Sequence, residues 1–203
     1  DLPVHERLVV KKNRLMPENA TGKEKRVSIV TGTHGDELDG VIFLGTGNQP
    51  KSVVNAGLKF AHMAKLVHGD RYRSRLINKL MFGTYNKRIK DNRTDSDWLT
   101  KDTAIVDKYT ADPKCYYMFT ANGYIGFLNV IRFDINEKNI ARTPAALPVL
   151  FASGEEDPVG DYGKAVKKVF KLYTKYVDNV ELRLYEDDRH ELHSETNRQE
   201  VFE

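Results

Sequence analysis

The last third of the chain alternates between strand-like and helix-like stretches, and this order limits the possible folds more than any other feature. Residues 147–153 (LPVLFAS) and 180–185 (VELRLY) have the apolar pattern of strands. The stretch 164–176 between them repeats apolar residues at helical spacing, and residues 196–203 begin another helix. Strands separated by helices pair in parallel and carry the helices on the faces of the sheet. We therefore predict an α/β fold.

Two apolar runs in the first quarter of the chain extend this prediction. Residues 27–31 and 40–44 have the composition of short buried strands, and we expect the first to lie beside the second and cover part of its exposed edge. The segment 48–146 is predicted to be mostly helical and irregular. Within it, Thr94 is expected to cap a helix that begins near Trp98.

Composition narrows the classes of function. A net charge of +3 over 203 residues is too small to indicate a nucleic-acid partner. The single cysteine, Cys115, fits a reducing compartment, and with no apolar run long enough for a membrane span and no secretory signal we expect a cytoplasmic protein. Lysine and arginine are in excess between residues 51 and 93. This excess indicates either a solvated helical face or a basic amphipathic cover that approaches anionic lipid surfaces.

An acid and a histidine follow two consecutive predicted strands. Asp157 comes after 147–153, and His190 comes after 180–185. The carboxyl ends of parallel strands are where ligand chemistry occurs in such sheets, and acid before histidine is the chain order of the triad in α/β-hydrolases. The alternative is that Asp157, which precedes a proline, is an ordinary turn residue and that His190 is a surface loop histidine.

Residues 36–203 resemble the α/β-hydrolase family that includes lysophospholipases, monoacylglycerol lipases and serine aminopeptidase-like hydrolases. The matching stretches are GDELDGVIFLGTG, GDRYRSRLINKLMFGTYNKRIKDNRTDSDWLTKD, LPVLFASGEEDPVGDYGKAVKKV and LRLYEDDRHELHSETNR. The resemblance implies that Asp157 is the triad acid, that His190 is the triad base and that 48–146 is a lid that shapes an acyl pocket. It implies hydrolysis of a small carboxylic ester of acylglycerol or lysophospholipid type, without a cofactor.

The sequence departs from that family at the nucleophile. The family carries its serine in a G-x-S-x-G turn just before the GDELDG strand, and this sequence contains no G-x-S-x-G. Ser28 is the one serine upstream of GDELDG, and it lies inside an apolar run without flanking glycines. We therefore expect an incomplete α/β-hydrolase fold that is inactive as it stands.

The first residues of the chain resemble a different family. The stretch that ends in VSIVTGTHGDE is similar to the start of the succinylglutamate desuccinylase/aspartoacylase branch of the zinc carboxypeptidases. This resemblance implies that His34 and Glu37 are zinc ligands in an H-x-x-E pattern. We predict a junction: 1–38 from a zinc deacylase and 39–203 from the C-terminal part of an α/β-hydrolase. The alternative functions are a zinc-dependent deacylase half-site and a non-catalytic chimeric remnant.

Overall fold

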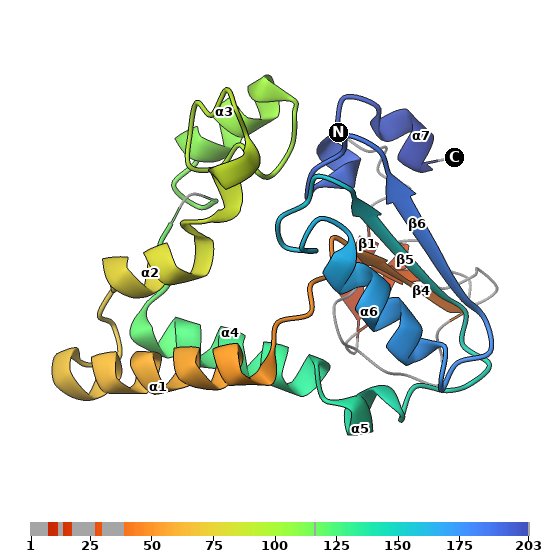
Figure 1. Cartoon of the computed structure of the whole chain (residues 1–203), viewed down its shortest axis with the longest axis horizontal. Helices are drawn as coiled ribbons and strands as arrows, with labels where there is room; N and C mark the ends of the chain where they lie inside the picture. Colours follow the sequence, from red (N-terminus) through yellow and green to blue (C-terminus); the bar gives the residue numbers. More distant parts are fainter. Residues whose placement is uncertain (1–7, 12–13, 18–26, 30–38, 116, 203) are drawn as a thin grey trace.

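One side of the molecule is built on a parallel sheet of four strands in the order β3-β4-β5-β6. Strands β4, β5 and β6 lie on the right in Figure 1. The computed structural model describes residues 8–11, 14–17, 27–29, 39–115 and 117–202. The parallel α/β arrangement expected from the alternation of elements is confirmed. The predicted strand at 27–31 pairs with the predicted strand at 40–44, with Val27 opposite Gly40 and Ile29 opposite Ile42. The strands are β3 (Val27–Ile29), β4 (Gly40–Leu44), β5 (Val149–Gly154) and β6 (Val180–Tyr185).

A short antiparallel hairpin precedes the sheet. Its strands are β1 (Leu8–Lys11) and β2 (Arg14–Pro17), paired from Leu8 opposite Pro17 to Lys11 opposite Arg14.

The main core lies between the sheet and α6 (Lys164–Tyr173). Strand β5 is central, so most of its side chains are buried on both faces, as expected for a strand in a parallel sheet. The rings of Phe43 and Phe151 stack with their centres 5.0 Å apart, and Tyr173 of α6 packs edge-on against Phe151 with the ring centres 5.1 Å apart. This aromatic contact ties α6 to β4 and β5 and so fixes the loop that joins β5 to α6.

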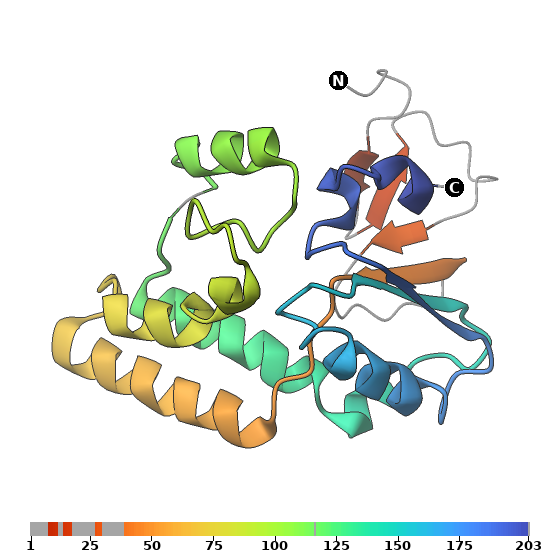
Figure 2. The same ribbon diagram turned by 45° about the horizontal axis from the view of Figure 1, so that its top comes forward.

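A helical insertion between β4 and β5 forms a lobe beside the sheet (Figures 1 and 2). Its two longest helices lie side by side and bury Val54, Leu58 and Leu128 between them. The expected helical character of 48–146 is confirmed. The insertion contains α1 (Lys51–His68), α2 (Arg75–Phe82), the 3₁₀ helix η2 (Tyr85–Arg88), α3 (Thr103–Ala111), α4 (Ala121–Asp134) and α5 (Glu137–Ile140).

After β6 the chain ends in two short elements, η3 (Leu192–Ser194) and α7 (Arg198–Phe202). Within the described part of the chain, no helix has the length and apolar character needed to cross a bilayer.

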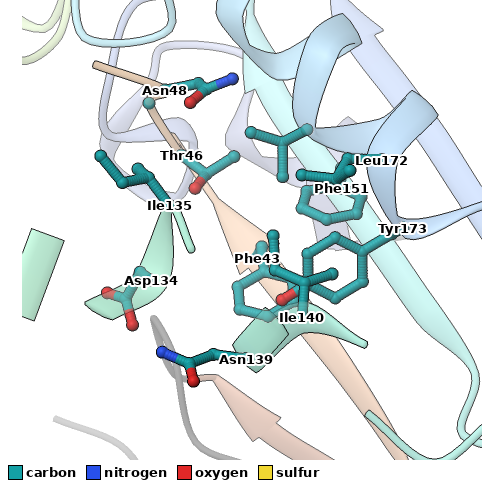
Figure 3. Close-up of a pocket in the computed structure, with 12 residues that line it drawn as sticks. Phe43, Thr46, Asn48, Asp134, Ile135, Asn139, Ile140, Phe151, Leu172 and Tyr173 are labelled. Atoms are coloured by element: carbon teal, nitrogen blue, oxygen red, sulfur yellow. The ribbon is translucent and has the colours of Figure 1, made fainter. Parts of the chain in front are cut away.

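A cavity of about 60 Å³ lies where the end of α4 meets the sheet and α6 (Figure 3). The rings of Phe43, Phe151 and Tyr173 form one side, and Asp134 and Asn139 lie on the other. Burial raises the pKa of Asp134 to about 6. Burial also raises the pKa of Tyr173 to about 12, with a further contribution from the negative charge of Asp134.

Asp134→Asn is expected to stabilise the protein above neutral pH. Because the pKa of this carboxyl is higher in the folded chain than in the unfolded chain, its ionisation opposes folding. The penalty is absent at low pH and grows as the pH rises through the folded-state pKa. Since the group is partly exposed, we expect a gain of only about 1 kcal/mol near pH 8 and none near pH 4. Urea unfolding at both pH values measures this, and an equal gain at both would contradict the assignment.

Candidate active site

Asp157 lies in the loop that follows β5, and its carboxylate is fully buried and held from three directions. One oxygen, Oδ2, lies 3.0 Å from Nδ1 of His190. The other, Oδ1, accepts a 2.8 Å hydrogen bond from the backbone N–H of Val159, and the Ser153 hydroxyl lies 3.4 Å from Oδ2. A buried carboxylate with fixed partners on both oxygens has one orientation, and that orientation points at the histidine.

His190 lies in the loop that follows β6, the strand next to β5. Its side chain is 26% exposed, with Nδ1 turned inward to Asp157. When the Nδ1–H donates a hydrogen bond to the carboxylate, Nε2 keeps a free lone pair and can accept a proton. The structure therefore brings together the two residues that the sequence placed at the ends of adjacent strands.

Gly45, at the end of β4, allows this histidine to sit against the sheet. Its backbone has a φ of +58°, which favours glycine. A Cβ atom at this position would lie 2.7 Å from His190 Nδ1, inside van der Waals contact. The absence of a side chain at residue 45 is therefore a requirement of the histidine position.

A second buried carboxylate, Glu195, holds the His190 loop to the helical insertion. Glu195 is fully buried. Its Oε1 accepts a 2.8 Å hydrogen bond from the N–H of Arg189, next to the histidine, and its Oε2 accepts a 3.0 Å bond from the N–H of Lys101 in the insertion. One carboxylate thus joins two backbone segments that are 88 residues apart in sequence, taking 189 minus 101.

Further hydrogen bonds connect the same two segments. The Arg189 guanidinium donates to the carbonyls of Asp97 and Thr100 at 2.7 and 3.2 Å, and the N–H of Glu191 donates to the carbonyl of Leu99 at 2.7 Å. The Thr100 hydroxyl donates to the carbonyl of Ser194 at 2.9 Å. We call the segments 97–101 and 189–195, with these bonds, the clasp. Sequence reasoning missed it, because an acid five residues after the histidine is its only local signal.

Aromatic rings of the insertion cover the outer side of the histidine. The Trp98 ring centre lies 5.2 Å from that of His190, and Tyr85 packs edge-on against Trp98 at 4.9 Å. Burial raises the pKa of Tyr85 to about 12, with a smaller contribution from the negative charge of Asp157. The tyrosine is therefore a neutral hydrogen-bonding group beside the Asp157–His190 pair across the physiological pH range.

A cavity of about 400 Å³ lies within the insertion, and Trp98 forms part of its lining. Most of its lining is aromatic or apolar, with a few polar groups, which is the usual character of a site for a small organic molecule. The lining residues are Asn78, Phe82, Asp95, Ser96, Trp98, Tyr109, Cys115, Tyr117, Met118 and Phe119.

The other predicted site residues are placed as follows. His34 and Glu37, the predicted zinc ligands, lie outside the described residues. Ser28 lies in the middle of β3, opposite Val41, rather than at a turn after a strand. Across the described ranges there is no group of three or more His, Cys, Asp or Glu side chains that could hold a metal ion.

Three solved structures illustrate the similarity of fold. A thermostable carboxyl esterase from Bacillus coagulans in complex with glycerol has a TM-score of 0.75 at 24% identity, over 83% of this chain and 55% of that one. A lipase in an open form has a TM-score of 0.69 at 27% identity, over 82% and 55%. A soluble variant of monoglyceride lipase from Saccharomyces cerevisiae, in complex with a substrate analogue, has a TM-score of 0.58 at 21% identity, over 84% and 52%. The chain spans just over half the length of these proteins.

A comparison with curated proteins found no match. The sequence profile of the family described as serine aminopeptidase, S33, matches residues 27–197. This range covers most of the chain and includes β3, both loops of the Asp157–His190 pair and the whole insertion. The predicted division between 1–38 and 39–203 stays a prediction. The chain belongs to the S33 serine aminopeptidase family of α/β-hydrolases.

Proposed function

We propose that this chain carries the acid and the base of a serine-dependent hydrolase of small carboxylic esters, of the acylglycerol or lysophospholipid type. The observation that carries the proposal is the 3.0 Å contact between Asp157 Oδ2 and His190 Nδ1 at the carboxyl ends of two adjacent parallel strands. Esterases and lipases among the structural neighbours support this class of reaction.

The two side chains divide the chemistry. His190 Nε2 takes the proton from a serine hydroxyl as the oxygen attacks the ester carbonyl, and it then returns that proton to the leaving alcohol. Asp157 keeps the Nδ1 proton in place and stabilises the imidazolium that forms. Because Asp157 is buried and its oxygens have partners, little reorganisation is needed when charge develops on the ring.

The cavity of about 400 Å³ that Trp98 lines supports an acyl ester as the substrate. Its volume of about 400 Å³ suits a chain of several carbons, and its aromatic lining favours transfer of that chain from water. Trp98 contacts both the cavity and the imidazole, so a chain held there places its ester group beside His190.

A fluorophosphonate probe and a fusion protein test the proposal together. Because the sequence contains no G-x-S-x-G, we expect no labelling of the 203-residue chain by the probe.

A fusion that places the nucleophile strand, turn and helix of a similar esterase before residue 39 is expected to hydrolyse p-nitrophenyl butyrate. His190→Ala should then lower its kcat by about 10³-fold or more. Replacement of the exposed His193 by Ala is the matched control. A folded fusion whose kcat is unchanged by His190→Ala would refute the proposal.

The outer face of the first two insertion helices supports the proposal that the substrate is reached at a lipid surface. Large apolar side chains there are 39% to 86% exposed, and a groove of about 310 Å³ runs between the helices. Exposed cations flank this apolar face, as in proteins that lie on anionic bilayers. The apolar residues are Val53, Phe60, Met63, Leu66, Val67, Tyr72, Leu76 and Leu80, and the cations are Lys59, Arg71, Arg73, Arg75 and Lys79.

We expect the chain to bind vesicles that contain phosphatidylglycerol and to bind vesicles of phosphatidylcholine alone much more weakly. Replacing Arg71 and Arg73 together by Gln should weaken binding to the anionic vesicles by about 10-fold or more, since each cation near such a surface contributes about 1 kcal/mol. Replacing Lys167 and Lys171 of α6 by Gln is the matched control. Equal binding to both vesicle types, or concentration-dependent dimerisation through this face, would contradict the proposal.

A further inference from the structure

Another cavity, of about 390 Å³, lies next to the loop that carries Asp157. Its walls come from the segment after β4, the 3₁₀ helix η2, the loop between β5 and α6, and the start of α6. The residues that line it are Asn48, Gln49, Pro50, Thr84, Tyr85, Lys87, Arg88, Pro158, Asp161, Tyr162, Ala165 and Lys168. Pro158 directly follows the proposed acid, so this cavity adjoins the proposed active site.

The charge of this cavity is positive. Lys87, Arg88 and Lys168 meet there from two different elements, and Asp161 is the one carboxylate in the lining. Among the described residues, no acid lies within ion-pair distance of these three cations. The three side chains are exposed, so water and salt screen their mutual repulsion, and an anion bound in the cavity would be attracted by all three.

The position of Arg88 is held by a strained turn. Asp161 and Tyr162 both have positive φ, 47° and 55°, and Gly163 follows at 79°. Positive φ is uncommon for residues with a side chain, and runs of it occur where a site needs the geometry. The turn places the Tyr162 ring under Arg88, whose guanidinium carbon lies 3.6 Å from the ring centre. The cation is thus positioned by stacking, which leaves its N–H groups free to donate to a ligand.

We infer that this cavity is an anion site that takes a phosphate-like group, with Arg88, Lys87 and Lys168 as its cations. Arginine and lysine donate charge-assisted hydrogen bonds to phosphate oxygens, and the hydroxyls of Thr84 and Tyr85 and the amides of Asn48 and Gln49 add uncharged donors.

The geometry also links the anion site to the ester. Tyr85 lines the cationic cavity, Trp98 lines the aromatic cavity, and the two rings touch each other next to His190. A molecule with an acyl chain in one cavity and a phosphate in the other would have its ester bond near the imidazole. This assignment rests on the proposed function, and it makes the substrate an acyl ester that bears an anionic group.

Direct binding of inorganic phosphate to the 203-residue chain tests the site without any catalytic step. We expect saturable amide shifts in nitrogen–proton NMR spectra at Tyr85, Arg88 and Tyr162, with a Kd of about 1 mM at constant ionic strength. Lys168→Gln should raise this Kd about fivefold, since it removes one charge-assisted contact from an exposed position on α6. Asp161→Asn should lower the Kd about twofold or more, because it removes the one negative charge in the lining.

Lys167→Gln, one residue along the same helix and outside the lining, is the matched control and should leave the Kd unchanged. The absence of saturable shifts, or equal weakening by Lys167→Gln and Lys168→Gln, would overturn the anion site. These results do not depend on hydrolysis, so they are separable from failure of the fluorophosphonate and fusion experiments.

A short-chain monoacyl glycerol 3-phosphate, used below its micelle concentration, distinguishes a substrate head group from free phosphate. If the anion belongs to the substrate, this probe should bind at least about 10-fold more tightly than inorganic phosphate, and it should also shift the amides of Phe82 and Trp98. Equal affinity for both ligands, with no shift at these aromatic residues, would overturn the head-group assignment.

Discussion

Asp157→Asn is expected to turn His190 from a proton acceptor into a proton donor on its outer side. The asparagine amide can donate to Nδ1, and the ring proton then moves to Nε2, the atom that must be free to act as a base. In the fusion enzyme, kcat for p-nitrophenyl butyrate should fall by about 10⁴-fold. In the 203-residue chain, long-range nitrogen–proton NMR spectra should show the change of tautomer directly.

Asp187→Asn is the matched control for this substitution. Asp187 lies in the His190 loop, its side chain is 78% exposed, and its φ of +63° suits asparagine. It should change neither the tautomer nor the rate. An Asp157→Asn variant that keeps the proton on Nδ1 and loses less than about tenfold in kcat would show that the contact between Asp157 and His190 has no catalytic role.

Glu195→Ala is expected to have the largest effect on stability. It leaves the partly buried backbone N–H groups of Arg189 and Lys101 without their acceptor, and each such loss costs about 1–3 kcal/mol. We expect a total of about 3 kcal/mol, or a fall in Tm of about 8 °C for a chain of this length. Differential scanning calorimetry measures this, and amide exchange at Lys101 and Arg189 should accelerate in the same variant.

The clasp predicts that Tm falls in steps across the variants of Glu195. Glu195→Gln keeps one carbonyl oxygen, so it should protect one of the two N–H groups and fall between wild type and Glu195→Ala. The exposed Glu200→Ala should be neutral. If Glu195→Ala lowered Tm no more than Glu200→Ala did, the carboxylate would not be what holds the insertion to the histidine loop.

The parts of the fold that could be predicted from sequence are those with a local signal. Strand β5 is a short apolar run, α6 has apolar residues at helical spacing, and β6 alternates, so their order and type follow from periodicity. The meeting of Asp157 with His190 then follows from the rule that parallel strands end at the same edge. No atomic detail was needed for that step.

The contacts across the insertion could not be predicted in this way. Thr94 has the type of a helix cap, yet it bonds with the carboxylate of Asp97 in a turn, and the next helix starts at Thr103 with Asp102 as its cap. The bond from Lys101 to Glu195 joins residues 94 apart, and nothing in either neighbourhood marks the other as its partner. Long-range pairs of this kind depend on how the lobes meet, which periodicity does not encode.

The clasp would also limit how a substrate of the proposed reaction could enter. Movement of the insertion away from the sheet at residues 97–101 would have to break the bonds that hold Arg189 and Glu191 on either side of the histidine. Opening at this end would therefore also displace His190 from its position next to Asp157. We therefore expect substrate to enter and product to leave at the end of the insertion formed by α1 and α2, which carries none of these bonds.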